Sequence, residues 1–178
     1  DGYGYLLRAS HKPQKTTEIY LQYFSEHKEK NLPERLSTKN ETVANVRHSL
    51  QAGLDYAFSR TLSINSKLLY NTFGYQGFAA SKGFAFVQDL NADLGRLSVT
   101  ARVAYFNTDD YDSRIYVYER DVLFSFSIPA YYNQGLRNYL LVQYKFNRHI
   151  DAWFRIARSR LYDQDTYGSD LEDACKRI

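Results

Sequence analysis

The sequence predicts an all-β fold, an antiparallel up-and-down meander of about nine or ten strands that forms part of a transmembrane β-barrel. Three observations predict it: long stretches alternate between apolar and polar residues, tyrosine is abundant, and the connections are of two lengths. Alternation with a period of two puts neighbouring side chains on opposite faces of a strand, which a helix cannot do. The 17 Tyr and 11 Phe residues favour pleated, half-buried surfaces.

The longest alternating stretch covers 46–58, where the even positions are mostly apolar and the odd positions mostly polar. Shorter stretches of the same kind surround Ile19, Val99 and Val142. In chain order, the predicted strands span 3–10, 16–28, 43–59, 61–72, 81–91, 95–108, 114–128, 135–147 and 149–162. The only candidate for a helix is the tail, 169–177.

The connections predict how the strands are arranged. Tight connections are expected at 59–60, 92–95 and 146–149, and longer polar ones at 29–42, 73–82, 107–113 and 129–135. Strands joined by tight turns are antiparallel neighbours, so the sheet is a meander. Short turns at one end and long loops at the other are typical of outer-membrane barrels.

The alternation changes phase once, within the predicted strand 114–128. Ile115 and Val117 put odd positions on the apolar face, whereas Val122 and Phe124 put even positions there. The slip falls on 119–121. A β-bulge would restore the faces, and a tight turn would instead split the stretch into two strands.

Alternation alone does not say which face meets water. In a soluble barrel the apolar face is the core, whereas in a membrane barrel it meets lipid and the polar face lines the lumen. Strands of more than ten residues, aromatic residues near strand ends and charges of both signs on the polar face favour the membrane. The candidate lumen-facing residues are Glu18, Arg47, Asp55, Lys67, Asp89, Arg102, Lys145, Asp151 and Arg155.

Composition limits the alternatives. A net charge of +3 is too small to indicate nucleic-acid binding, and the single cysteine, Cys175, excludes an internal disulfide and a cysteine-based zinc site. No apolar run is long enough for a transmembrane helix. The chain contains no Met and no final strand that closes on an aromatic residue. We therefore expect residues 1–178 to be a single barrel segment that is incomplete at both ends.

One stretch carries a resemblance to a known family. Its features are a Tyr-x-x-Asp-x-Leu run at 118–123, Ser-x-Pro-Ala at 127–130, Gly-x-Arg at 135–137 and an aromatic-rich strand pair after them. This stretch, within 111–165, resembles the C-terminal part of Bacteroidota-type outer-membrane β-barrel proteins that are often labelled helix-hairpin-helix or competence-like. The resemblance implies an outer-membrane barrel and carries no catalytic set. The helix-hairpin-helix module is absent here, so no DNA-binding role is implied.

No catalytic or metal site is expected. His48 and Ser49 are adjacent in a strand and so point to opposite faces, and His149 lies beside Asp151 in a predicted turn. The run Asp163-x-Asp165-x-x-Gly168 resembles the start of a calcium loop, but Tyr167 and Ala174 stand where the loop needs oxygen ligands. Neither a cofactor nor an enzymatic activity is predicted.

The sequence therefore favours a non-catalytic outer-membrane segment that acts as a pore, transporter or membrane scaffold. Its expected partners are outer-membrane lipid or lipopolysaccharide and the remaining strands of the parent chain. No nucleic-acid partner is expected, because Glu18, Glu26 and Glu29 interleave with a basic patch and cancel most of its field. The patch consists of Lys12, Lys15, Lys28 and Lys30. Two alternatives stay open: a soluble antiparallel barrel that binds an apolar ligand, and a surface adhesin-like β-domain.

Overall fold

A computed structural model describes residues 2–31, 42–122, 125, 127–162, 166–167 and 172–173 of the 178-residue chain. The secondary structure of these residues is entirely β. No helix long and apolar enough to cross a membrane occurs in the described ranges.

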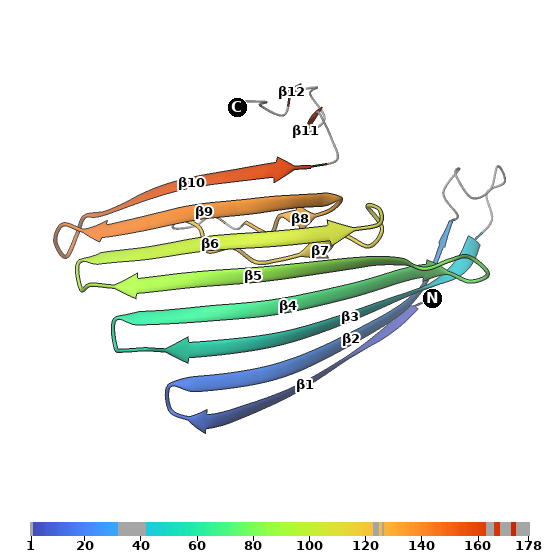
Figure 1. Cartoon of the computed structure of the whole chain (residues 1–178), viewed down its shortest axis with the longest axis horizontal. Helices are drawn as coiled ribbons and strands as arrows, with labels where there is room; N and C mark the ends of the chain where they lie inside the picture. The colour runs from blue at the N-terminus through green and yellow to red at the C-terminus, as the bar shows by residue number, and fades with distance from the viewer. Residues whose placement is uncertain are drawn as a thin grey trace.

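Eight strands form one antiparallel sheet in the order β1-β2-β3-β4-β5-β6-β9-β10 (Figure 1). Their bounds are β1 (Gly2–Gln14), β2 (Thr17–Asn31), β3 (Thr42–Ala57), β4 (Leu62–Tyr75), β5 (Ser81–Asp93), β6 (Leu97–Thr108), β9 (Gln134–Lys145) and β10 (Asp151–Leu161). The predicted all-β meander is confirmed, with eight long strands among the described residues in place of about nine or ten. The sheet is open, with β1 and β10 at its edges, so barrel closure stays a prediction.

Connections of two lengths lie at opposite ends of the sheet, as the sequence predicts (Figure 1). Tight turns join β1 to β2, β3 to β4, β5 to β6 and β9 to β10. Backbone hydrogen bonds close three of them, from Phe58 N to Leu62 O at 3.0 Å, from Leu94 N to Leu97 O at 2.8 Å and from Phe146 N to Ile150 O at 3.0 Å. The longer connections follow β2, β4 and β6.

The predicted strand 114–128 is wrong. Residues 109–133 form one long connection between β6 and β9, which we call the covering segment. Within it, β7 (Ile115–Tyr116) pairs with β8 (Ala130–Tyr131), and Glu119 forms an isolated bridge with Ser127. The phase of the alternation slips at 119–121 because the chain reverses direction between Glu119 and Ser127. This arrangement is closer to the turn alternative than to a bulge.

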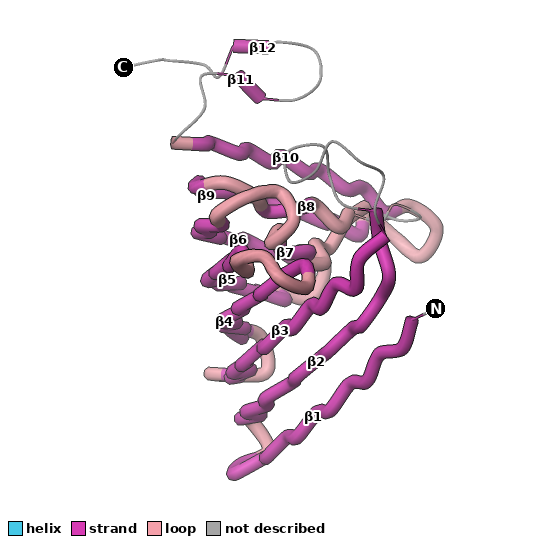
Figure 2. The backbone as a smooth tube through the Cα atoms, turned by 90° about the vertical axis from the view of Figure 1, so that its right-hand side faces the viewer, coloured by secondary structure: helices cyan, strands magenta, loops and turns pink. Residues whose placement is uncertain are grey.

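The covering segment lies against one face of the sheet, beside β4, β5, β6 and β9 (Figure 2). Ile115, Val117 and Tyr131 are buried from its side. The ring of Tyr131 stacks on that of Phe106 with centroids 4.9 Å apart. The sheet contributes Leu69, Ala85, Val87, Ala104, Phe106 and Leu161 to the same core. The apolar core is therefore local, between the covering segment and the central strands.

Glycine permits this close approach at Gly83 on β5. A Cβ atom there would collide with the carbonyl oxygen of Ser113 and lie 2.9 Å from Thr108 Cγ2. Any larger residue at position 83 would push the covering segment away from the sheet.

The C-terminal tail differs from its prediction where it is described. β11 (Thr166–Tyr167) pairs with β12 (Glu172–Asp173), so the helix predicted over 169–177 is wrong at 172–173. The other residues of that predicted helix lie outside the described residues. The same holds for Asp163, Asp165, Gly168 and Ala174 of the calcium-loop pattern.

Candidate functional site: the polar face and the covering segment

Strand pairing brings four of the predicted lumen residues into one row on the polar face. Glu18 pairs with Asp55, Asp55 with Asn65, Asn65 with Asp89, and Asp89 with Arg102. Paired residues of an antiparallel sheet share a face, so their side chains are neighbours. The row runs from an open part of the face on β2 and β3 to a covered part on β5 and β6.

The covered end of this row holds a buried ion pair. Arg102 is only 3% exposed and donates two hydrogen bonds to the Asp89 carboxylate, Nε to Oδ1 at 2.5 Å and Nη2 to Oδ2 at 2.7 Å. Its Nη1 donates to the carbonyl oxygen of Tyr118 at 2.7 Å, which ties the covering segment to β6. The guanidinium also lies over the ring of Tyr139, 5.2 Å from its centroid.

A second ion cluster is centred on Glu119 of the covering segment, which is fully buried. Arg137 on β9 donates to both carboxylate oxygens, at 2.7 and 2.9 Å, and Arg155 on β10 donates to Oε2 at 2.5 Å. The Tyr131 hydroxyl donates to Oε1 at 3.1 Å and the Ser127 hydroxyl to Oε2 at 3.2 Å. A carboxylate with this many donors is held in one position.

The electrostatics of this cluster favour the charged carboxylate. Burial alone would raise the pKa of Glu119, but the hydrogen bonds and positive charges of Arg137 and Arg155 outweigh burial and lower it. Burial and the nearby Glu119 charge raise the pKa of Tyr131. Tyr131 therefore stays protonated and remains a donor to Glu119.

The acidic residues Asp109 and Asp110 anchor the start of the covering segment. Asp110 Oδ1 accepts hydrogen bonds from Ser81 Oγ at 2.8 Å, from Asp112 N at 2.9 Å and from Ser113 N at 3.1 Å. Asp109 Oδ2 accepts one from Lys82 N at 2.9 Å. These carboxylates act as turn and strand-end acceptors in the described structure.

The remaining predicted lumen residues lie apart from the two ion clusters. Arg47 reaches the covering segment from β3 and donates to the Asp112 carbonyl at 3.3 Å. Lys145 and Asp151 are cross-strand partners beside the tight turn between β9 and β10. Lys67 is half-buried on β4 and makes no hydrogen bond or ion pair among the described residues. The nine predicted residues therefore form no single centre.

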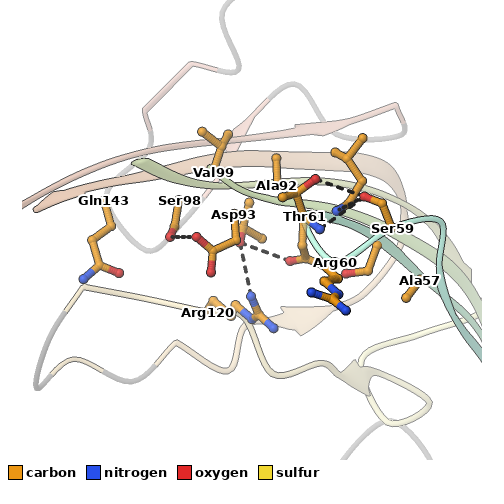
Figure 3. A pocket seen from close by; sticks show the side chains of 14 residues that line it. Ala57, Ser59, Arg60, Thr61, Ala92, Asp93, Ser98, Val99, Arg120 and Gln143 are labelled. Atoms are coloured by element: carbon orange, nitrogen blue, oxygen red, sulfur yellow. Dashed lines mark hydrogen bonds between the residues drawn. The ribbon is translucent and has the colours of Figure 1, made fainter. Parts of the chain in front are cut away.

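A polar hollow of about 410 Å³ lies at the tight-turn end of the covered face (Figure 3). The ends of β4, β5, β6 and β9 contribute to its walls, and Arg120 of the covering segment enters it. Arg120 Nη1 donates to Thr100 Oγ1 at 3.4 Å, and Asp93 accepts from Ser98 Oγ at 3.4 Å. Two smaller hollows, of about 190 and 160 Å³, adjoin β2, β3 and β4.

The opposite face of the sheet is apolar and exposed. A representative row across β3, β4, β5 and β6 consists of Ala52, Leu68, Phe86 and Tyr105. Leu68 is 48% exposed and Phe86 is 40% exposed. Toward the end of β10 this face also carries two arginines, Arg158 and Arg160.

Polar groups in the middle of the apolar face bond within the sheet. Ser66 Oγ donates to Gln88 Oε1 at 2.6 Å. Gln88 Nε2 donates to the Asp89 carbonyl oxygen at 3.2 Å. The two side chains therefore satisfy part of their hydrogen-bonding capacity without a partner from outside the sheet.

Aromatic pairs mark both ends of this apolar face. Near the tight turns, the rings of Tyr56 and Phe58 and those of Tyr144 and Phe146 each meet edge to face with centroids 4.7 Å apart. At the other end, Tyr3 stacks on His27 at 4.7 Å. Such pairs add packing energy beyond their burial.

No catalytic arrangement is found among the described residues. Strand pairing puts His48 on the face opposite Ser49, and the His48 Nδ1 atom lies 2.8 Å from the Tyr23 hydroxyl. His149 is exposed in a turn and its backbone N–H donates to Asn147 Oδ1 at 2.8 Å. Within the described residues, no group of three or more His, Cys, Asp or Glu side chains is placed to hold a metal ion.

Glu119 and Arg137 are the central residues that sequence reasoning missed. The alternation places Glu119 only at the phase slip of the predicted strand 114–128, and Arg137 enters only through the family resemblance. One signal was present in the sequence: 83–87 reads Gly-Phe-Ala-Phe-Val, which is apolar at successive positions. Such a run is typical of a strand buried on both faces and indicates that something covers β5.

Comparison of the chain with protein-family models, with curated proteins and with solved structures finds no match. The arguments that follow therefore start from the geometry described above.

Proposed function

We propose that this chain forms eight strands of an outer-membrane β-barrel, with its apolar face toward lipid and the covering segment inside the lumen. The barrel that the chain helps to form serves as a non-catalytic pore, transporter or membrane scaffold, in keeping with the resemblance to Bacteroidota-type barrels. The observation that supports this proposal most strongly is the contrast between the two faces of the sheet. One face is apolar and exposed, whereas the other holds buried ion pairs.

The dimensions of the apolar face support this proposal. On β9 the apolar face runs from Leu136 to Tyr144, eight residues farther along the strand. These nine residues fall within the roughly 9–11 residues that a tilted strand needs to cross the bilayer core. The aromatic pairs near both ends of the face correspond to the two aromatic girdles of such barrels.

The covered face supports a lumen rather than an apolar ligand site. A soluble barrel that holds an apolar ligand needs an apolar interior. The face that carries the covering segment instead presents Glu18, Asp55, Asn65 and Lys67 beside it. Charged groups of both signs suit a water-filled interior, in which they pair with one another and with water.

The two open edges also fit the proposal. β1 and β10 each have one partner among the described residues, so each leaves one row of backbone groups without a described strand partner. In lipid such groups must pair, so the remaining strands of a barrel are the partners that these edges require.

Refolding tests the proposal. The protein, as its gene encodes it, is refolded with and without detergent micelles and followed by circular dichroism and by gel mobility before and after boiling. The proposal expects strand signal only in micelles, with a mobility that changes on boiling. A monodisperse, strand-rich protein in plain buffer would overturn it and favour a soluble β-domain.

A further inference from the structure

We infer that hydrophilic solutes cross this barrel between the covering segment and strands β1–β3, and that β5, β6, β9 and the part of β4 beyond Lys67 are closed to them. The inference rests on the proposed function, because it needs the polar face to line a lumen. It adds the position of the water-filled route and the residue, Lys67, that marks its border.

The first observation is the unequal cover over the polar face. On β5 and β6 the side chains that point to this face are buried: Ala85 and Val87 are 0% exposed, Ala104 is 0% exposed and Arg102 is 3% exposed. On β4, Leu69, Asn71 and Phe73 point to the same face and are also buried, whereas the corresponding residues Arg8 and Ser10 on β1 are exposed. The covering segment therefore fills one side of the lumen and leaves the other side open.

The second observation is that the covered side is firmly held. Glu119 links the covering segment to Arg137 and Arg155, and Arg102 holds its backbone at Tyr118. A water-filled passage through this region would have to separate buried ion pairs, which is costly. The route is therefore expected to avoid β5, β6 and β9.

The third observation is the position of the hollows. A hollow of about 160 Å³ lies where Ile115 and Tyr116 of the covering segment meet β2, β3 and β4. Another, of about 190 Å³, lies at the tight-turn end and is lined by Lys12, Glu18 and Asp55. Both adjoin β2–β4, one at the tight-turn end and the other in the middle of these strands. They mark space between the polar face and the covering segment, which Arg47 and Asn71 cross to donate to the carbonyl oxygens of Asp112 and Arg114.

Lys67 lies at the border between the open and the covered side. Its cross-strand partner on the same face is Val87, which is completely buried under the covering segment. Lys67 is half-buried and, within the described part of the chain, forms no hydrogen bond or ion pair. Its neighbour Leu68 points to the apolar face and is 48% exposed.

These three positions give a matched test at nearly one depth in the membrane. In a Cys175→Ser background, Lys67→Cys, Val87→Cys and Leu68→Cys are made singly and the protein is reconstituted in lipid vesicles. The rate of labelling by a charged, membrane-impermeant maleimide is then measured. We expect Lys67→Cys to react about tenfold faster or more than the other two, because water reaches only that side chain. In denaturant all three variants should react alike.

Different results overturn different claims. If Val87→Cys reacts as fast as Lys67→Cys, the covering segment does not close the β5 side and the inferred route is wrong. If Lys67→Cys is as slow as both other variants, the β4 side is also closed, and the route is again wrong while the membrane placement stands. If Leu68→Cys reacts as fast as Lys67→Cys, the apolar face is wet and the proposed function itself fails.

Discussion

The Glu119 carboxylate accepts two hydrogen bonds from the guanidinium of Arg137, at 2.7 and 2.9 Å, across the space between the covering segment and β9. This fork-to-fork contact joins residues from a connection and a strand, and Arg155 of β10 adds a third bond to the same carboxylate. The geometry is the strongest that a guanidinium and a carboxylate can form. It explains why a long connection lies on the sheet instead of extending into solvent.

Removal of the Glu119 charge should destabilise the protein strongly. In Glu119→Gln, two largely buried guanidinium groups lose their anionic partner, and such a loss costs about 3–5 kcal/mol. Urea unfolding of the reconstituted protein measures the change. The matched control is Glu26→Gln, since Glu26 pairs with Lys28 at 2.6 Å in a more exposed position. The control should cost about 1 kcal/mol or less. Equal losses in the two variants would show that the Glu119 cluster contributes no more than a surface pair.

Acid should abolish the contribution of Glu119. The pKa of Glu119 in the folded protein lies below its ordinary value of 4.5, because Arg137 and Arg155 favour the charged form. A lowered carboxylate pKa stabilises the fold above the ordinary value, and this stabilisation is lost as the pH falls through the folded-state pKa. The difference in unfolding free energy between wild type and Glu119→Gln should therefore be large at neutral pH. It should shrink on titration below about pH 4. A difference that does not change with pH would contradict the role of the charge.

Gly83→Ala should loosen the covering segment without changing any charge. The added Cβ collides with the carbonyl oxygen of Ser113, so the segment must move away from β5. Overpacking of this kind costs about 1–3 kcal/mol. Gly74→Ala is a milder control, because its Cβ would lie 3.2 Å from the Ala80 side chain. Both are compared by urea unfolding and by maleimide labelling of Val87→Cys. If Gly83→Ala changes neither the unfolding free energy nor the labelling rate of Val87→Cys, the covering segment does not pack as closely on β5 as described.

An arginine on the apolar face should be costly only if that face meets lipid. Leu68→Arg places a charge on the exposed apolar face, which costs about 2–4 kcal/mol near the midplane of a bilayer and less near its surfaces. Asn65→Arg, on the same strand and the opposite, half-exposed face, is the matched control and should cost much less. The test compares the unfolding free energies of the two variants in lipid vesicles. If both arginines are tolerated equally in folded protein, the apolar face is in contact with water.

The sequence predicted the elements with local signals and missed the contacts that depend on tertiary packing. Period-two alternation located β3 over 43–59, where the structure has Thr42–Ala57. Three of the four tight turns were also predicted, because their position follows from where the alternation is interrupted; the turn between β1 and β2 was not among them. Alternation could not show that 109–133 folds back on the sheet. Ile115 and Val117 are apolar because they pack in a small core between this segment and the polar face of the sheet.

The candidate site was predicted in type more than in detail. Arg102 and Arg155 were chosen as polar-face residues, and both lie there with buried acidic partners. Arg102 and its partner Asp89 face each other within one hairpin, whereas Arg155 binds Glu119, which lies 36 positions earlier in the chain. No spacing rule predicts such a pair, because it depends on how the covering segment reverses.

The central claim is that one face of the sheet meets lipid and the other meets a polar lumen. Spin labels introduced singly along β4 from Leu62 to Phe73 in lipid vesicles test it most directly, by their relaxation with oxygen and with a water-soluble nickel complex. The account predicts oxygen access that peaks at the apolar-face positions, Leu68 and Tyr70 among them. It predicts nickel access that peaks on the other face, at Lys67. Equal access of the nickel complex to Leu68 and Lys67 would contradict the account.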